Sequence, residues 1–274
     1  MSLKTMMITA DAGVAAHITG AGTDVVFVDL EAMGKAARQG HLDTWKSPHG
    51  PADISAVRDA VPGAAVMVRL NPLHAGSAAE IDDALARGAD QLMLPMFREA
   101  AVLARFMELV AGRADVVPLV ETADALADMA GIAALRPARV HIGLNDLHLD
   151  FGHRFLFEPL ANGLLDDAAA ILGEAGLPFG IGGVARLGEG LVPAEVILGE
   201  HVRLGSTWVI LSRTFHRRTE TLDDLEANLD FTTELKALRA RYEDWQKATA
   251  EEIETNRLAL QSLVAQVITG RPTA

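Results

Sequence analysis

The stretch 88–122, GADQLMLPMFREAAVLARFMELVAGRADVVPLVET, predicts a strand, a helix and a second strand in succession. The segments "DQLMLP" (90–95) and "DVVPLV" (115–120) are short and mostly apolar, and "REAAVLARFMELVAG" (98–112) between them is rich in Ala and Leu. Strands that alternate with helices of this length imply parallel βαβ units. An acid, Glu121, directly follows the second strand.

The same alternation continues on both sides of this unit. Further strands are predicted at 6–9, 24–30, 64–70, 139–144, 178–183 and 202–211. About eight repeats in a domain of ~250 residues are typical of a closed (β/α)₈ barrel. An open doubly wound sheet is the alternative, but the first strand lacks the GxGxxG loop with which such sheets bind dinucleotides. We therefore expect an α/β fold, specifically a (β/α)₈ TIM barrel.

The composition changes beyond residue 220. The segment is charged, contains no glycine before Gly270 and has a helical period. We expect one helix over about 233–268, starting at Thr232 or Thr233 and on the order of 54 Å long at ~1.5 Å per residue. Residues 1–220 are thus expected to form the catalytic barrel and 221–274 a C-terminal helical arm on a neighbouring subunit of a homo-oligomer. A last barrel helix with a solvated tail is the alternative.

Composition excludes several classes of function. The 274 residues carry a formal net charge of −13 with no basic stripe, which argues against a nucleic-acid partner. No apolar run reaches the ~18–20 residues of a membrane span, and no secretory signal is visible. Cysteine is absent, which excludes disulfides and thiolate chemistry. We expect a cytoplasmic protein without a membrane partner.

Polar residues follow four of the predicted strands, at the end where a barrel of this type carries its function. They are Glu31, Arg69 with Asn71, Glu121, and Asn145 with Asp146. Carboxylates gathered in an apolar mouth are forced to protonate unless a cation lies between them. Oxygen ligands favour hard ions such as Mg²⁺ or Mn²⁺ and leave positions for a chelating substrate. Thr122, in contrast, is expected only to cap the next helix.

Five segments together resemble one superfamily. They are "VFVDLE", "VRLN", "GADQLMLPMF", "PLVET" and "IGLNDLHLDFG". Their order and spacing, over roughly residues 20–215, are similar to those of the metal-dependent 2-oxo acid aldolases and citrate lyase β-subunits of the HpcH/HpaI type. The resemblance implies that Glu121 and Asp146 hold a divalent metal and that Arg69 binds the oxo group of pyruvate or oxaloacetate. It also implies an active-site or supporting acid at Glu31.

The implied activity is that of a class II carbon–carbon lyase that cleaves or forms 2-oxo acid aldols with Mg²⁺ or Mn²⁺. Retro-aldol cleavage leaves an enolate, whose charge a metal can absorb as a Lewis acid. Arg69 would donate hydrogen bonds to the same oxygen. No lysine follows a strand, which disfavours a Schiff base. Asn145 and Pro95 are further candidates for substrate contacts.

This chain departs from the family pattern at the catalytic base. The bacterial aldolases have a histidine after the acid that matches Glu31, whereas Ala32 and Met33 follow here. The loop 32–50 instead offers His41 and His49 as bases, and Lys46 or Lys35 as the partner of a distal carboxylate. A solvent loop whose histidines have no role is the alternative.

Two other functions stay open. A citrate-lyase-like enzyme acting on an acyl-CoA thioester would need basic residues at the barrel mouth for the CoA phosphates. The candidates for them are Arg154, Arg186, Arg203 and Arg213. A barrel that binds a 2-oxo acid without turnover, a pseudoenzyme, is the third hypothesis.

Overall fold

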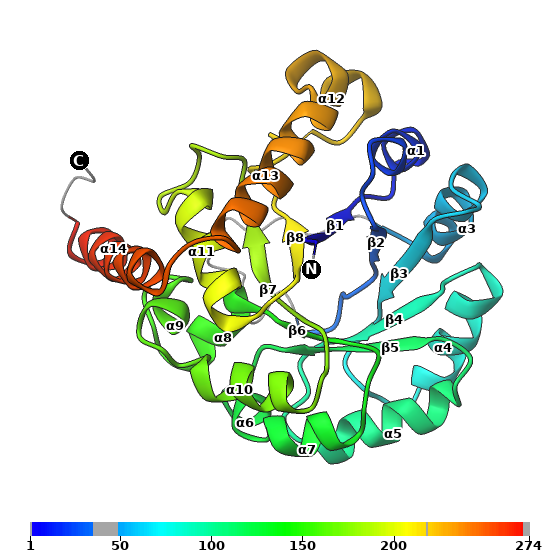
Figure 1. Cartoon of the computed structure of the whole chain (residues 1–274). Coiled ribbons are helices and arrows are strands. Elements are labelled where there is room, and N and C mark those ends of the chain that lie inside the picture. The colour runs from blue at the N-terminus through cyan, green and yellow to red at the C-terminus, as the bar shows by residue number, and fades with distance from the viewer. Residues whose placement is uncertain (1, 35–48, 218, 271–274) are drawn as a thin grey trace.

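A computed structural model describes residues 2–34, 49–217 and 219–270 and contains eight parallel strands in a closed barrel (Figure 1). The strands pair in chain order, and β8 closes on β1. Their bounds are β1 Lys4–Ile8, β2 Val25–Asp29, β3 Ala65–Arg69, β4 Gln91–Leu94, β5 Asp115–Val120, β6 Val140–Ile142, β7 Phe179–Val184 and β8 Trp208–Leu211. The predicted TIM barrel is confirmed.

Helices follow the strands and form the outer layer of the barrel (Figure 1). Up to β7 they are α1 Ala12–Gly20, α3 Pro51–Ala60, α4 Ser77–Ala86, α5 Ala100–Val110, α6 Ala123–Ala127, α7 Met129–Ala134, α8 Leu144–Asp150, α9 Glu158–Ala161 and α10 Asp166–Glu174. After β7 come α11 Ala194–Leu204, α12 Leu222–Asn228, α13 Phe231–Trp245 and α14 Ala250–Thr269.

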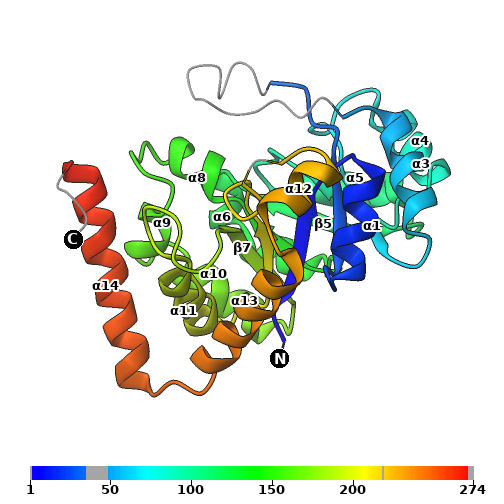
Figure 2. The same cartoon turned by 90° about the horizontal axis from the view of Figure 1, so that it is seen from above.

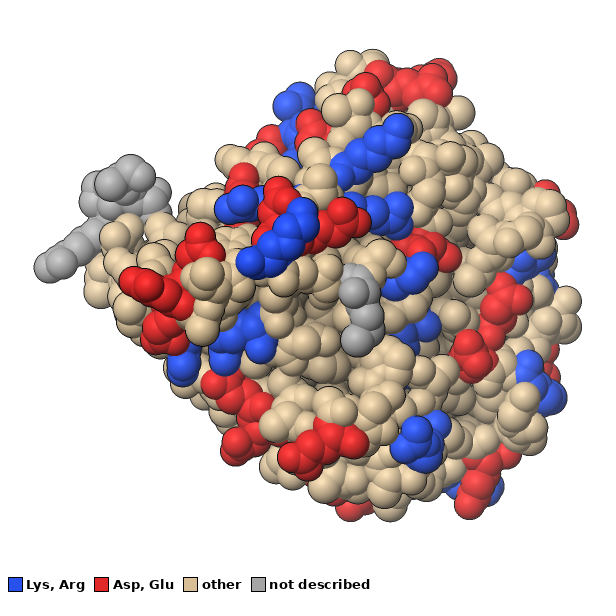
Figure 3. All heavy atoms as spheres, viewed as in Figure 1, with Lys and Arg blue, Asp and Glu red and all other residues tan. Residues whose placement is uncertain are grey.

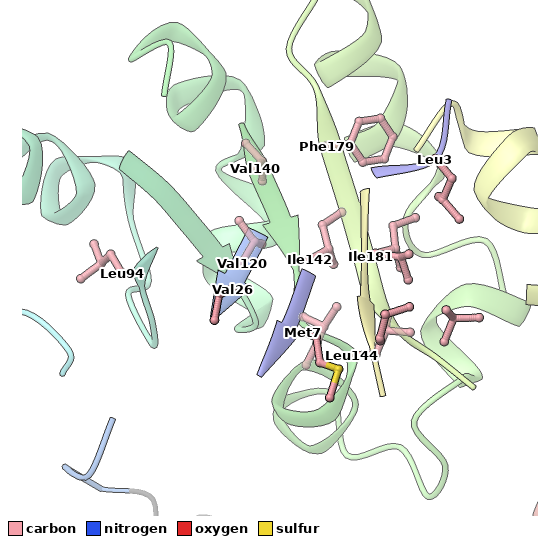
Figure 4. Packing of buried hydrophobic residues seen from close by; sticks show 14 of the residues in the cluster. Leu3, Met7, Val26, Leu94, Val120, Val140, Ile142, Leu144, Phe179 and Ile181 are labelled. Carbon is pink, nitrogen blue, oxygen red and sulfur yellow. The ribbon is translucent and has the colours of Figure 1, made fainter. Parts of the chain in front are cut away.

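The strands are apolar on both faces because each face is covered. Successive side chains alternate between the barrel interior and the helices. Val120, Ile142 and Ile181 belong to the cluster that packs under the helices (Figure 4). The interior cluster consists of Met6, Val25, Phe27, Met67, Met93, Val117 and Leu119. Asp29, Arg69 and Glu121 each come two residues after a member of this interior cluster (Phe27, Met67 and Leu119), so their side chains also face the barrel interior.

The amino end of the barrel interior is filled by a buried arginine. Arg139 is 4% exposed, donates from Nη2 to Gln91 Oε1 at 2.7 Å, and stacks over the Trp208 ring at 4.2 Å. Its Nη2 also lies 3.5 Å and 3.3 Å from the sulfurs of Met6 and Met67. Burial lowers the pKa of Arg139 to about 10, so the guanidinium stays charged at neutral pH. The opposite, carboxyl end is where the candidate site lies.

The prediction of one helix over 233–268 is wrong, because the segment forms α13 and α14 with a break between Trp245 and Ala250. Asp230, rather than Thr232 or Thr233, caps α13. Thr249 starts the new helix: its hydroxyl accepts the N–H of Glu252, whose carboxylate accepts the N–H of Thr249. This capping box satisfies backbone donors that a continuous helix would use internally.

Helix α13 packs on the barrel as its last wall helix. Tyr242 is 2% exposed and donates to the carbonyl of Ser206 at 2.9 Å, and Arg239 donates to the carbonyl of Gly22 at 2.8 Å. The division at residue 220 stays a prediction, although α13 contributes Leu235 and Leu238 to the main core.

Helix α14 lies along the outside of the molecule against α11 and α9 (Figure 2). Its Asn256 donates to the carbonyl of Val196 at 3.0 Å, and Gly199 of α11 permits this close approach because a Cβ there would lie 2.4 Å from Asn256. Leu258 is 56% exposed on the other face. The role of the helix as an arm in a homo-oligomer stays a prediction.

The eighth strand begins later than predicted. Residues 202–204 end α11, and Gly205 terminates that helix with a left-handed φ of 78°. Glycine adopts this conformation without the strain that a Cβ introduces. The strand proper is Trp208–Leu211.

The described part of the chain contains no helix that is both long enough and apolar enough to cross a membrane. Acidic and basic side chains lie side by side on the face drawn in Figure 3. Charged side chains of the described residues often pair, as Arg203 does with Asp166 at 2.8 Å.

Candidate functional site

An arginine–aspartate pair forms the base of the site at the carboxyl end of β2 and β3. Arg69 donates from Nε and Nη2 to the two oxygens of Asp29, both at 2.8 Å. The two residues are direct partners in the register of the strands. The side chain of Asp29 is 2% exposed and that of Arg69 14%. Two parallel charge-assisted hydrogen bonds fix the guanidinium plane.

Two more carboxylates act on the same arginine. Glu31 Oε2 lies 3.5 Å from Arg69 Nε, and the Glu31 side chain is 2% exposed. Glu121 is 3% exposed and interacts electrostatically with Arg69. Burial alone lowers the pKa of Arg69, but Asp29, Glu31 and Glu121 outweigh it and raise the pKa above its ordinary value. The guanidinium is therefore a permanent cation in this mouth.

Glu121 is held at the end of β5 in an environment that disfavours its charge. Burial raises its pKa to about 8, against the attraction of Arg69, and repulsion from Asp146 and Glu31 adds to the rise. Its Oε1 accepts the N–H of Met96 at 3.1 Å. Met96 has a φ of 54°, a strained conformation for a residue with a Cβ. The loop after β4 is thus bent to aim a backbone donor at this carboxylate.

Asp146 reaches the site from a helix rather than from the strand end where it was predicted. β6 stops at Ile142, and both Asn145 and Asp146 lie in the first turn of α8. Asp146 is 7% exposed, whereas Asn145 is exposed. Gly143 starts the helix, and a Cβ there would lie 3.1 Å from Glu121 Oε2 and 3.0 Å from Leu119 Cδ1. Glycine at this position allows α8 to approach Glu121 closely.

The two buried acids suit a hard divalent cation. Their donors are all oxygens, and a bound dication would offset the burial and the repulsion from Asp146 and Glu31 that raise the pKa of Glu121. In the described ranges, no group of three or more His, Asp or Glu side chains is arranged to hold a metal. Mg²⁺ commonly takes one or two carboxylates and completes its shell with water and substrate oxygens, so Glu121 with Asp146 fits it.

Residues 6–156, more than half of the chain, match the model of the HpcH/HpaI aldolase/citrate lyase family. The chain belongs to this family. The match includes Glu31, Arg69, Glu121 and Asp146, and membership supports an enzyme of the lyase class.

A solved HpcH/Hpal aldolase/citrate lyase family protein from Burkholderia cenocepacia J2315 has the same fold. The TM-score is 0.61 at 17% identity, over 89% of this chain and 94% of the other. No curated protein matches this chain in sequence.

His49 was predicted as a catalytic base for this HpcH/HpaI family member, and its contact in the structure restricts that role. His49 Nδ1 accepts the N–H of Asp29 at 3.1 Å. A neutral ring that accepts through Nδ1 carries its proton on Nε2. His49 would have to release this contact before Nδ1 could take a proton. Its role as a base stays a prediction.

The other predicted contacts are placed only in part. Pro95 is buried just after β4. It continues the alternation in which Gln91 and Met93 face the barrel interior. His41, Lys46 and Lys35 lie outside the described residues. Thr122 caps α6 as predicted, since its hydroxyl accepts the N–H of Ala125 at 3.3 Å, and it also donates to the carbonyl of Phe97 at 2.8 Å.

Sequence reasoning missed three contributors to the site: Asp29 as the partner of Arg69, Met96 as a donor to Glu121, and Gly143 as the point of close approach. Only Asp29 could have been found from the sequence, because it lies two residues before Glu31 and therefore on the same face of the strand.

Proposed function

We propose that this HpcH/HpaI family member is a divalent-metal-dependent carbon–carbon lyase, a class II aldolase that cleaves or forms 2-oxo acid aldols. The supporting observation is the convergence of Arg69, Glu121 and Asp146 in one buried mouth. Glu121 and Asp146 would hold Mg²⁺ or Mn²⁺. When bound, this ion supplies Lewis-acid stabilisation of negative charge on the substrate oxygens.

Arg69 orients the 2-oxo acid and stabilises the charge that develops on it. Asp29 occupies two of the five N–H donors of the guanidinium and leaves others for a substrate oxygen. When the C3–C4 bond breaks, its electron pair forms the C2=C3 double bond, the π pair of the C2 carbonyl moves to the C2 oxygen, and the deprotonated C4 oxygen forms the new carbonyl. A fixed, buried cation is worth more there than in water because little reorganisation is needed as the charge forms.

Cleavage also needs a base for the proton of the C4 hydroxyl. Glu31 is one candidate for this role because its carboxylate lies on the same rim as Arg69, 3.5 Å from the group that would bind the substrate. His49 is the alternative base on the described rim, after rearrangement of its contact with Asp29. Glu31→Gln and His49→Ala separate the two: the variant that loses turnover of an aldol substrate but keeps metal affinity identifies the base.

Oxaloacetate decarboxylation tests the proposal most directly, because it needs an enolate but no base for a C4 hydroxyl. Pyruvate release with Mn²⁺ should exceed the rate of free Mn²⁺ alone, which serves as the blank. Glu121→Gln and Asp146→Asn should each lower the enzymatic rate at least a hundredfold. Asp124→Asn, a matched change of an exposed acid on α6, should keep it within twofold.

A protein no faster than the blank, with Glu121→Gln unchanged in its binding of oxalate, would exclude the proposed enzyme. The outcome would favour the non-catalytic 2-oxo acid barrel. The acyl-CoA alternative gains little from the basic candidates, since Arg203 pairs with Asp166 and Glu200, and Arg186 pairs with Glu189.

A further inference from the structure

Asp150, at the end of α8, lies in a contact that links three elements of the barrel mouth. Its Oδ1 accepts from Arg98 Nη2 at 2.8 Å, and its Oδ2 accepts the N–H of Ala123 at 2.8 Å. Arg98 belongs to the loop after β4, and Ala123 starts α6 two residues after Glu121. Arg98 also donates from Nη1 to Asp124 at 2.8 Å.

The other end of α8 is attached to the same strand junction. The N–H of Gly143 donates to the carbonyl of Val120 at 2.9 Å, directly before Glu121. The start of the helix also lies against the Glu121 carboxylate, because a Cβ added at Gly143 would lie only 3.1 Å from Glu121 Oε2. Helix α8 is therefore fastened to the β5–α6 junction at both ends, before and after Glu121.

Asp146 lies between these two attachments. Residues four apart on a helix share a face, so Asp146 and Asp150 face the same side of α8. Asp146 is 7% exposed, while the side chains of Asp150 and Arg98 are 24% and 53% exposed. Asp150 thus lies toward solvent, and Asp146 at the buried end of the same face.

We propose that the Arg98–Asp150–Ala123 contact is a positioning device that sets the separation of the Glu121 and Asp146 carboxylates and thereby the affinity for the divalent cation. The inference rests on the proposed function. Ligand geometry must be held within about 0.5 Å for a productive site. A seven-residue helix attached only at its start could rotate and carry Asp146 away from Glu121.

The electrostatics of Asp150 agree with a stable contact. Burial raises the pKa of Asp150, but the Ala123 N–H and the Arg98 guanidinium outweigh it and hold the pKa below its usual range. The carboxylate is therefore charged at neutral pH. An exposed pair of this kind contributes little to global stability, so its loss should affect local geometry more than folding.

The test is Mn²⁺ binding to the metal-free full chain, measured by the electron paramagnetic resonance signal of free Mn²⁺. Asp150→Ala should weaken binding at least tenfold, with little change in the melting temperature. Asp124→Ala is the matched control, because it removes one acid from the same arginine but keeps both Asp150 contacts. It should change the affinity less than twofold. Arg98→Gln, which opens the contact from the other side, should weaken binding at least threefold.

The outcomes separate the inference from the proposed function. Wild-type binding with unchanged affinity in Asp150→Ala and Arg98→Gln overturns the positioning role and leaves the metal site intact. Equal weakening by Asp150→Ala and Asp124→Ala also overturns it, because the effect would then be a general loss of negative charge. A wild-type protein that binds no Mn²⁺ overturns both.

Discussion

Loss of Arg69 should destabilise the protein more than loss of its partner Asp29. The pair is buried and doubly hydrogen-bonded at 2.8 Å, and removal of one member of such a pair costs ~3–5 kcal/mol. In Asp29→Asn, Arg69 keeps the attraction of Glu31 at 3.5 Å and of Glu121. We therefore expect the free energy of unfolding to fall by about 3 kcal/mol, the low end of this range. In Arg69→Met, three buried acids lose their shared cation, and we expect the upper end, about 5 kcal/mol.

The measurement is urea unfolding followed by circular dichroism, first with a chelator and then with Mn²⁺. A ligand at a hundred times its Kd stabilises the folded state by ~2.7 kcal/mol. At the same excess of Mn²⁺ over its own Kd, each variant gains the same stabilisation, so the difference between Arg69→Met and Asp29→Asn should persist when the ion is bound. The reasoning is refuted if Asp29→Asn is the less stable variant, or if Arg69→Met loses less than about 1 kcal/mol, the value of an ordinary exposed pair.

Three further predictions concern stability and the site. Burial lowers the pKa of His201 to about 4 from 6.5, so the unfolded chain takes up this proton first. Stability from this group should fall as pH drops from 6.5 toward 4, by ~3 kcal/mol in total at ~1.36 kcal/mol per pKa unit, and urea titrations of His201→Gln should show a flatter slope. Gly143→Ala should weaken Mn²⁺ binding, seen by titration calorimetry, because the Cβ would press on Glu121 and Leu119; unchanged affinity would contradict the close approach. Tyr242→Phe should cost ~1–2 kcal/mol in urea unfolding, since the buried Ser206 carbonyl loses its donor, and no loss would show that water replaces the phenol.

The architecture was predictable because a parallel barrel leaves a regular signal. Each strand is buried on both faces and reads as an apolar run, and each helix separates two such runs. The positions of Glu31, Arg69 and Glu121 followed from the same rule, since side chains just after a strand share one rim.

Two boundaries beyond residue 200 failed because local chemistry overrode the periodic pattern. The apolar stripe continues from Leu238 to Leu260, but the capping box at Thr249 and Glu252 starts a second helix. "VRLGSTWVIL" reads as one strand, although its first residues complete α11 and Gly205 turns the chain before β8. In one case a pair of polar residues and in the other a single glycine decides the boundary.

The interior contacts of the site were beyond single-sequence reasoning. The donor from Met96 to Glu121 depends on a left-handed backbone that favours glycine, so methionine gives no hint of it. The approach of Gly143 to Glu121 depends on the packing of α8, which only the folded chain establishes.

Under the proposed function, the uneven distribution of charge along the barrel has a consequence for the order of ligand binding. Among the described residues, Asp29, Glu31 and Glu121 act on the guanidinium of Arg69 and Asp146 acts on Glu121, while a further interior arginine, Arg139, lies at the far floor beside Trp208. An approaching oxo acid is itself an anion, and these carboxylates would repel it until a dication is bound. Binding should therefore be ordered, with the ion first and the organic ligand second.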